Sequence, residues 1–245
     1  MDDSQTANFP QQQKLLEGNG KISIIIPVIN EAVNIKSTLA TTQPSRNVEV
    51  IVVDGGSSDG TVEIVSNLGL KVIVANPGRA LQMNTGAWAT TGDILLFLHA
   101  DTRLPPGFDT MIRQAMEVSG VVAGAFTLKI DAELASLRLI EKGVGWRSRF
   151  WQMPYGDQGI FLKQEVFQAV GGFPELPIME DFEFIRSLKR QGRIVTLPAP
   201  VITSARRWLK KGVWQTTFIN QVVIVAYFLG ISPERIRSWY RRGKL

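Results

Sequence analysis

The chain has 245 residues, of which 44% are apolar and 20% charged, so it can bury a full core without disulfides or structural metals. It has no cysteine and one histidine, His99, which excludes a disulfide scaffold, a zinc finger, a thiolate nucleophile and an iron–sulfur protein. A bound metal must then be a hard ion held mainly by carboxylates, such as Mg²⁺ or Mn²⁺.

The net charge of +5 is concentrated at the C-terminal end of the chain. Residues 203–245 carry nine Lys or Arg and one Glu, a balance of +8, which leaves −3 for the rest. This segment is expected to meet a phosphate-bearing ligand or an anionic surface, unless it is simply a solvated basic tail.

Residues 1–20 are polar with little periodicity, and we expect a flexible leader rather than a signal peptide. No apolar run reaches the roughly 18–20 residues that a membrane span needs, and the longest is Val222–Leu229. We therefore expect a cytoplasmic protein.

From residue 21 to about residue 100, short β-branched runs alternate with segments of helical length. The expected buried strands are Ile22–Val28, Val50–Asp54, Val72–Ala75 and Ile94–His99. The expected crossover helices are Ala32–Thr41, Asp59–Leu68 and Ala80–Thr90. Ser57 or Ser58 is expected to cap the second helix, with Asp59 and Glu63 in its first turn. This order predicts a Rossmann-like, doubly wound, mostly parallel α/β sheet.

The second half of the sequence is less regular. Its expected strands are Val121–Ile130, Gly159–Leu162, Val195–Leu197 and Val201–Ser204. Its expected helices are Ala132–Phe150 (broken near Gly143–Gly145), Gln164–Val170 and Glu180–Gln191.

The stretch Trp214–Leu229 is apolar on most helical faces, and five basic residues follow it. These are Arg235, Arg237, Arg241, Arg242 and Lys244. Aromatic residues beside a basic cluster suit a helix at an anionic membrane interface, which would place the protein at the inner face of the membrane. A core or dimer helix with a soluble basic tail is the alternative.

Polar residues follow each of the first four expected strands. They lie in Pro27–Glu31, Asp54–Ser57, Pro77–Arg79 and His99–Asp101. Because ligands of parallel sheets bind beyond the carboxyl ends of the strands, these residues predict a binding site there. The glycines of Gly55–Gly60 have the wrong spacing and follow the wrong strand for a dinucleotide fingerprint, and no P-loop motif is present.

Three carboxylate motifs carry most of the expected chemistry. Asp54, followed by two glycines, suits close approach of a base or ribose, although a plain strand–helix turn would look the same. Asp101, just past an apolar strand, suits a divalent metal that bridges diphosphate oxygens. His99 is expected on the same side of that strand, unless it is merely a buried, hydrogen-bonded imidazole.

The pair Glu180-Asp181 opens a helix after a Pro-rich loop, so one carboxylate is placed to deprotonate an attacking hydroxyl. Acidic residues that only favour the helix dipole are the alternative. Gly156-Asp157-Gln158-Gly159 offers a carboxylate and an amide to a donor or acceptor sugar, or forms a tight turn before a strand.

Taken together, these motifs resemble the family 2 glycosyltransferases with a GT-A-type fold over about residues 21–208. The matching segments are Ser23–Glu31, Val50–Thr61, Gly86 with Gly92-Asp93, and Glu180-Asp181. A small bacterial subgroup of stand-alone members is similar through Pro77–Asn84, Tyr155–Gly159 and Ser204–Trp208. We accordingly expect a leader (1–20), one glycosyltransferase domain (21–208) with an irregular acceptor-side half, and a C-terminal helical extension (209–245).

The resemblance implies a role for each matching residue. Asp181, assisted by Glu180, would be the base of a single inverting displacement, and Asp101 with His99 would hold Mn²⁺ or Mg²⁺. The residues implied in binding the UDP- or GDP-sugar are Pro27, Glu31, Asp54, Gly55, Arg79, Asp157 and Arg207. Arg79 and Arg207 would stabilise the departing diphosphate, unless Arg206-Arg207 is only a solvated surface pair.

Two positions depart from the family pattern. His99 replaces the first acid of the Asp-x-Asp motif, and Ser204 stands where processive members carry Gln. The second departure favours transfer of a single sugar to an unidentified hydroxyl acceptor. A lipid-linked acceptor would be consistent with a C-terminus that binds a membrane. One alternative is a nucleotidyltransferase, but the loop after the first strand lacks the glycines and basic residues that such an enzyme needs. The other is a catalytically silent nucleotide-sugar binder or membrane-docked scaffold. Nucleic-acid binding is not expected, because no reading motif accompanies the basic residues.

Overall fold

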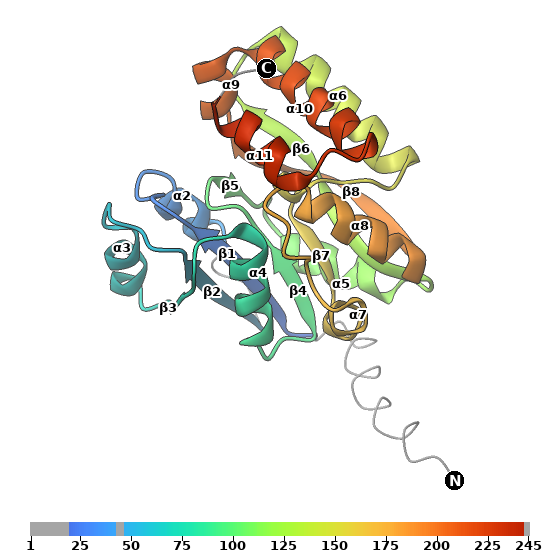
Figure 1. Ribbon diagram of the computed structural model, residues 1–245. Coiled ribbons are helices and arrows are strands. Elements are labelled where there is room, and N and C mark those ends of the chain that lie inside the picture. Colours follow the sequence, from blue (N-terminus) through green and yellow to red (C-terminus); the bar gives the residue numbers. More distant parts are fainter. Residues whose placement is uncertain (1–19, 43–46, 243–245) are drawn as a thin grey trace.

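The computed structural model describes residues 20–42 and 47–242 (Figure 1). Within them, eight strands form one sheet in the order β3-β2-β1-β4-β7-β6-β8-β5. The strands are β1 (Ile22–Val28), β2 (Val48–Asp54), β3 (Lys71–Val74), β4 (Ile94–Phe97), β5 (Thr102–Arg103), β6 (Val121–Asp131), β7 (Ile160–Lys163) and β8 (Arg193–Ser204). The predicted leader, apart from Gly20, lies outside the described residues.

The first half of the chain forms the parallel part of the sheet. Strand β1 pairs in parallel with both β2 and β4, and β2 pairs in parallel with β3. Alternate side chains of β1 enter two different cores, with Ile24 and Ile26 on one face and Ile25 on the other. Burial on both faces is the reason why these strands read as continuous apolar runs. The predicted doubly wound α/β sheet is confirmed.

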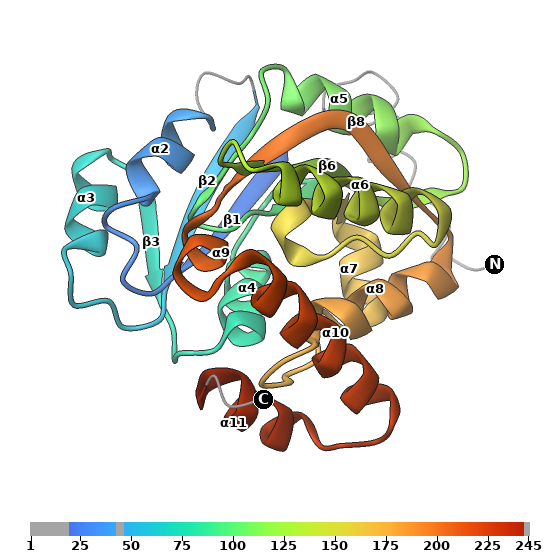
Figure 2. The same cartoon turned by 90° about the horizontal axis from the view of Figure 1, so that it is seen from above.

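Helices cover both faces of the sheet (Figures 1 and 2). One face packs against α2 (Ile35–Ala40), α3 (Thr61–Asn67), α5 (Phe108–Glu117) and α6 (Ala135–Phe150). The other packs against α4 (Arg79–Trp88), α7 (Gln164–Val170) and α8 (Glu180–Gln191). Four phenylalanines fill the core on this second side; they are Phe97, Phe167, Phe173 and Phe184.

The second half of the sheet mixes directions, because β7 runs antiparallel to both β4 and β6, and β5 runs antiparallel to β8. The prediction of two strands at Val195–Leu197 and Val201–Ser204 was wrong, since β8 is one strand parallel to β6. Its register shifts between Leu197 and Pro200. The bulge takes up the prolines, which cannot donate to a regular ladder, without ending the strand.

The break predicted in α6 near Gly143–Gly145 is absent, and the helix is continuous. A glycine within a helix costs about 1 kcal/mol relative to alanine, which packing of the helix against the sheet outweighs here. The cap predicted at Ser57 or Ser58 was also wrong. Helix α3 begins after Gly60, and the Asp59 carboxylate accepts the Thr61 N–H.

The C-terminal region folds as three helices among the described residues: α9 (Arg206–Lys211), α10 (Val213–Phe228) and α11 (Pro233–Arg242). Helix α10 buries Ile219, Val223 and Ala226 against the start of α8 and against α11. None of the described helices has the length and apolar character needed to cross a bilayer.

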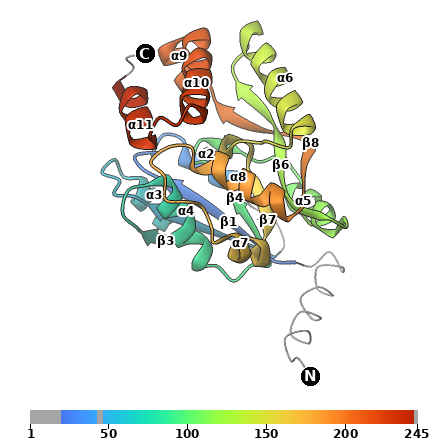
Figure 3. The same ribbon diagram turned by 45° about the vertical axis from the view of Figure 1, so that its right-hand side comes forward.

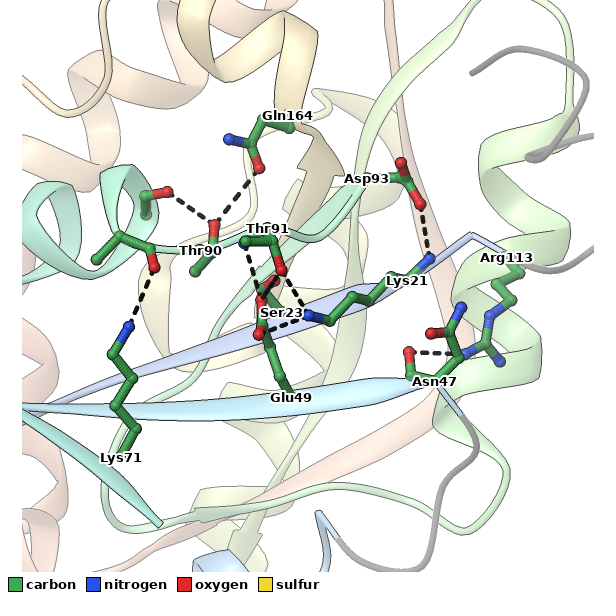
Figure 4. Close-up of polar contacts among 12 residues, drawn as sticks. Lys21, Ser23, Asn47, Glu49, Lys71, Thr90, Thr91, Asp93, Arg113 and Gln164 are labelled. Carbon is green, nitrogen blue, oxygen red and sulfur yellow. Dashed lines mark hydrogen bonds and ion pairs between the residues drawn. The ribbon is translucent and has the colours of Figure 1, made fainter. Parts of the chain in front are cut away.

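A polar cluster closes the amino-terminal edge of the parallel strands (Figure 4). The Glu49 carboxylate accepts hydrogen bonds from Lys21 Nζ at 2.7 Å, from Ser23 Oγ and from the Thr91 N–H at 3.0 Å. Burial opposes ionisation of Glu49, but these hydrogen bonds and the Lys21 charge outweigh it, and its pKa is lowered. This cluster ties the starts of β1 and β2 to the segment before β4.

Candidate functional site

The loops that leave β1 and β2 are joined by hydrogen bonds at the carboxyl edge of the sheet. Asn30 lies in the left-handed region (φ 53°), and its side-chain oxygen accepts the Ser58 N–H while its own N–H donates to Ser57 Oγ. The Asp54 carboxylate accepts the N–H groups of Gly56 and Ser57. These contacts fix the two loops on which the nucleotide-binding side chains are predicted.

Gly55 and Pro27 lie in this same region. A Cβ on Gly55 would approach the Ile29 side chain to 2.8 Å, so the glycine permits close packing of the two loops. Pro27 is half-buried near the end of β1, where it pairs in register with Val53.

Two amides of α4 hold the edge together, and the sequence analysis assigned neither a role. Gln82 is buried and donates to the carbonyls of Val28 and Val53, at the ends of β1 and β2. Asn84 both donates to and accepts from the backbone of Phe173, each at 2.8 Å. The sequence did contain an indication of their importance, because both residues lie within the segment Pro77–Asn84 that resembles the bacterial subgroup.

His99 and Asp101 lie in a turn, because β4 ends at Phe97; the argument that placed both on one side of a strand was wrong. The turn is fixed by the Thr102 N–H donating to the His99 carbonyl and by the Ser204 N–H donating to that of Asp101. Burial, with a contribution from the Arg79 charge, lowers the pKa of His99 to about 3, so the imidazole is neutral.

Glu180 and Asp181 begin α8 directly after Met179, a buried residue in the left-handed region (φ 70°). Such a conformation is costly for a residue with a side chain and is often found at functional sites. The Asp181 carboxylate accepts the N–H of Gly156 at 3.0 Å and that of Phe182 at 2.8 Å. A Cβ on Gly156 would lie 3.1 Å from His99 Nε2 and 3.4 Å from Asp181 Oδ2, so the two side chains face the same glycine.

Gln158 builds the loop that carries Gly156. This buried amide donates to the Phe126 carbonyl and accepts from the Tyr155 N–H and from Ser148 Oγ. It therefore acts as the structural centre of the short helix η2 (Gly156–Gln158), which forms the tight turn before a strand that was one of the two alternatives expected for this segment.

The same loop brings Asp157 to the site. Burial is the main reason why the pKa of Asp157 is raised to about 6, and the neighbouring Asp181 charge adds to it, while Arg147 and Arg79 oppose. Four buried side-chain polar atoms of the described residues lack a hydrogen-bond partner, and two of them are Asp157 Oδ1 and His99 Nε2. Unpaired buried polar atoms are costly, and a bound ligand would satisfy them.

Three arginines approach these carboxylates. Arg79 Nη1 lies 3.3 Å from Glu180 Oε1, and Arg206 Nη2 lies 2.8 Å from Glu31 Oε1. Arg207, the predicted diphosphate ligand, stacks over the Tyr240 ring and is near enough to Arg79 and Asp157 to interact electrostatically. The contact of Arg206 with Glu31 was not anticipated.

A divalent cation fits the acidic part of this site. Burial and the Glu31 charge raise the pKa of Asp101, against the opposing charges of Arg206 and Arg79, and a cation would relieve both effects. The described residues contain no cluster of three or more metal-ligating side chains. Mg²⁺ and Mn²⁺ can bind through one or two carboxylates together with substrate phosphates, and Asp101 could supply one such carboxylate.

The structure thus brings most of the predicted residues to one edge of the sheet, in two groups. Asp54 and Gly55, with Glu31, lie at the β1–β2 end, and the acids of α8 and η2 lie with His99 near Arg79.

The fold is that of the GT-A-type glycosyltransferases. The structure is similar to a mannosyltransferase from Pyrobaculum calidifontis in complex with GDP-Man and Mn²⁺, with a TM-score of 0.64 at 20% identity, over 89% of this chain and 71% of that one. It is also similar to glucosyl-3-phosphoglycerate synthase from Mycobacterium tuberculosis in complex with Mn²⁺, UDP and phosphoglyceric acid (TM-score 0.55, 18% identity, 77% and 72% of the two chains).

The particular family follows from the sequence comparison. The family description "Glycosyl transferase family 2" matches residues 23–173, and the chain belongs to this family. The predicted family and the predicted enzyme class are thereby confirmed.

Several curated relatives are named as glycosyltransferases or sugar transferases. A glycosyltransferase of Haloferax volcanii, AglE, is 41% identical over 185 residues, which is 62% of this chain and 56% of the relative. An undecaprenyl-phosphate 4-deoxy-4-formamido-L-arabinose transferase of Aeromonas hydrophila is 31% identical over 151 residues, 55% and 46% of the two chains. The chain spans about half the length of these relatives.

Proposed function

We propose that this chain transfers one sugar from a nucleotide-sugar donor to a hydroxyl acceptor, with inversion at the anomeric carbon. The observation that carries the proposal is the position of Asp181 beside two unsatisfied buried atoms, His99 Nε2 and Asp157 Oδ1. These groups would meet the hydroxyls of the transferred sugar, while Glu31 and Asp54 hold the nucleoside.

Asp181 is the proposed base. Two backbone N–H groups orient its carboxylate and leave further lone pairs for the acceptor hydroxyl. As the acceptor oxygen bonds to the anomeric carbon, its proton passes to Asp181 and the bond to the diphosphate oxygen breaks. Glu180, which is buried and paired with Arg79, positions that guanidinium rather than accepting the proton.

The leaving diphosphate gains negative charge, which Arg79 and Arg207 would stabilise. A divalent cation at Asp101, with His99 nearby, would supply further charge neutralisation at the diphosphate. Donation from the Arg206 guanidinium to Glu31 places α9 beside the proposed nucleoside site.

The proposed donor and acceptor are supported by the comparisons with known proteins. Solved neighbours have been observed with GDP-Man, UDP or UDP-GlcNAc, which supports a GDP- or UDP-sugar as the donor here. A lipid-linked acceptor at the inner face of the membrane is favoured by the undecaprenyl-phosphate relative and by the apolar C-terminal helix α10.

Replacing Asp181 with Asn tests the proposed base. The amide keeps the shape of the side chain but cannot take a proton, so transfer should fall by at least roughly 10²-fold while the thermal shift with UDP or GDP persists. Full activity of D181N would disprove the assignment of the base. Wild-type donor binding without transfer or slow donor hydrolysis would instead favour a silent nucleotide-sugar binder.

Replacing Asp101 with Ala tests the proposed metal site. The variant should retain its fold but lose the increase in nucleotide affinity that Mn²⁺ gives the wild type, measured by calorimetric titration with and without the metal. An unchanged Mn²⁺ effect would assign the ion to His99 or to another carboxylate.

A further inference from the structure

Helix α6 has an apolar face that points away from the sheet. Its inward side is formed by Leu137, Val144 and Ser148, which pack on the core or are buried. At 100° per residue, the opposite side carries Leu139, Trp146 and Phe150. These three are 60%, 52% and 69% exposed, and Trp151, directly after the helix, is 58% exposed.

The aromatic side chains of this face contact each other. Trp146 lies 5.6 Å from Phe150 and 5.0 Å from Trp151, measured between ring centroids. Gly143, on the same side, has no atom within 4 Å of the position where a Cβ would lie. We call Leu139, Trp146, Phe150 and Trp151 the α6 face.

One flank of the α6 face is positively charged. Lys142 and Arg149 lie beside it on the helix and are exposed, and within the described part of the chain their side chains form no ion pair or hydrogen bond. The one acid of the helix, Glu141, points inward, where it pairs with Arg138 and accepts the Ile130 N–H. Among the residues of α6 itself, the outward side therefore carries apolar and cationic side chains and no carboxylate.

Tryptophan and phenylalanine beside Lys and Arg form the composition of helices that lie in the headgroup region of anionic bilayers. We propose that the α6 face docks on an anionic lipid surface, with its aromatic rings at the boundary between headgroups and acyl chains and Lys142 and Arg149 on lipid phosphates. An anionic bilayer complements both features of this surface, because its headgroup boundary accepts the aromatic rings and its phosphates attract the two cations.

The position of α6 gives this docking a consequence. Helix α6 leads directly into the loop that carries Asp157, and Arg147 of α6 stacks on Tyr155 at 3.4 Å in that loop. Figures 1 and 3 show α6 and α10 at the same end of the molecule, beyond the end of β4 that leads to His99. Docking through α6 would therefore act on the loop that carries Asp157, and it does not depend on the proposed reaction.

The test is co-sedimentation of the full chain with phosphatidylcholine vesicles, with or without about one third phosphatidylglycerol. The wild type should bind the anionic vesicles, and binding should weaken as NaCl rises from roughly 0.05 to 0.5 M. W146S/F150S should weaken binding about tenfold or more. K142E/R149E should abolish the preference for phosphatidylglycerol.

W88S is the matched control, since Trp88 is 53% exposed on α4, and its binding should equal that of the wild type. Thermal shifts with UDP and GDP show that each variant keeps its fold and its donor site. No binding of the wild type, or full binding by W146S/F150S, would overturn the proposal. So would loss of binding in W214S/F218S alone, which would assign docking to α10, or a dimer that W146S/F150S dissociates without any vesicle binding.

Discussion

The two edges of the parallel sheet differ in how completely their polar groups are paired. At the amino edge, Glu49 is partnered by Lys21, Ser23 and Thr91, and its pKa is lowered. At the carboxyl edge, Asp157 keeps an unpartnered, buried oxygen and a raised pKa. Both edges belong to the same strands and share the same cores.

This contrast separates stability from function within one sheet. The amino edge has the arrangement expected where only folding matters, since each buried charge is compensated. The carboxyl edge gathers like charges and leaves hydrogen-bonding atoms free, which costs stability unless a ligand binds. Substitutions at the two edges should therefore have opposite effects on stability.

The largest expected effect is on the amino edge, in Gly92→Ala. A Cβ there would lie 2.9 Å from the Ser23 nitrogen and 3.0 Å from the Lys21 carbonyl oxygen, so the backbone itself must move. Urea unfolding should show a loss of about 3 kcal/mol or more. The control is Gly143→Ala on α6, where the space is open and a gain of about 0.5–1 kcal/mol is expected. Equal effects of the two changes would refute this picture of the amino edge.

At the carboxyl edge, Asp157→Asn should stabilise the protein at pH 7 by up to about 3 kcal/mol. The folded pKa of about 6 lies above the usual 3.8, so the ionised carboxylate opposes folding at neutral pH. As the pH falls from 6 towards 3.8, the folded wild type takes up a proton at Asp157 and regains stability. The difference in unfolding free energy between D157N and the wild type should therefore shrink to about 1 kcal/mol at pH 4.5.

Urea unfolding of wild type and D157N at the two pH values measures this difference. Transfer by D157N should at the same time fall roughly 10- to 100-fold, the value of a lost hydrogen bond to a charged group. A destabilised D157N at pH 7 would show that Asp157 is satisfied in the folded state.

The smallest effect is expected for Glu49→Gln, a loss of about 1–2 kcal/mol at pH 7 with no change in donor binding. Because the pKa of Glu49 is lowered in the folded state, its stabilising contribution should disappear as the pH falls through its folded value. Thermal unfolding across pH 3 to 7 would show it. If E49Q instead weakens nucleotide binding, the two edges are coupled.

Much of the secondary structure could be predicted from the sequence, because the patterns that indicate it involve residues that are close together in the chain. The runs Ile22–Val28, Gln164–Val170 and Glu180–Gln191 begin and end in the structure where they were predicted. Errors arose where distant contacts overrode a local signal, as in the glycines of α6 and the prolines of β8, which pairing with β6 keeps within one strand.

The sequence by itself determined the order of strands and helices, the family, and the edge of the sheet at which the acids gather. Hydrophobic periodicity and short motifs suffice for these, since both depend on neighbouring residues. Only the tertiary structure decided that Gln82 and Gln158 brace the site, that Arg206 contacts Glu31, and that α6 turns an aromatic face outward. Each of these depends on which residues distant in sequence meet in space, and no single sequence segment encodes that.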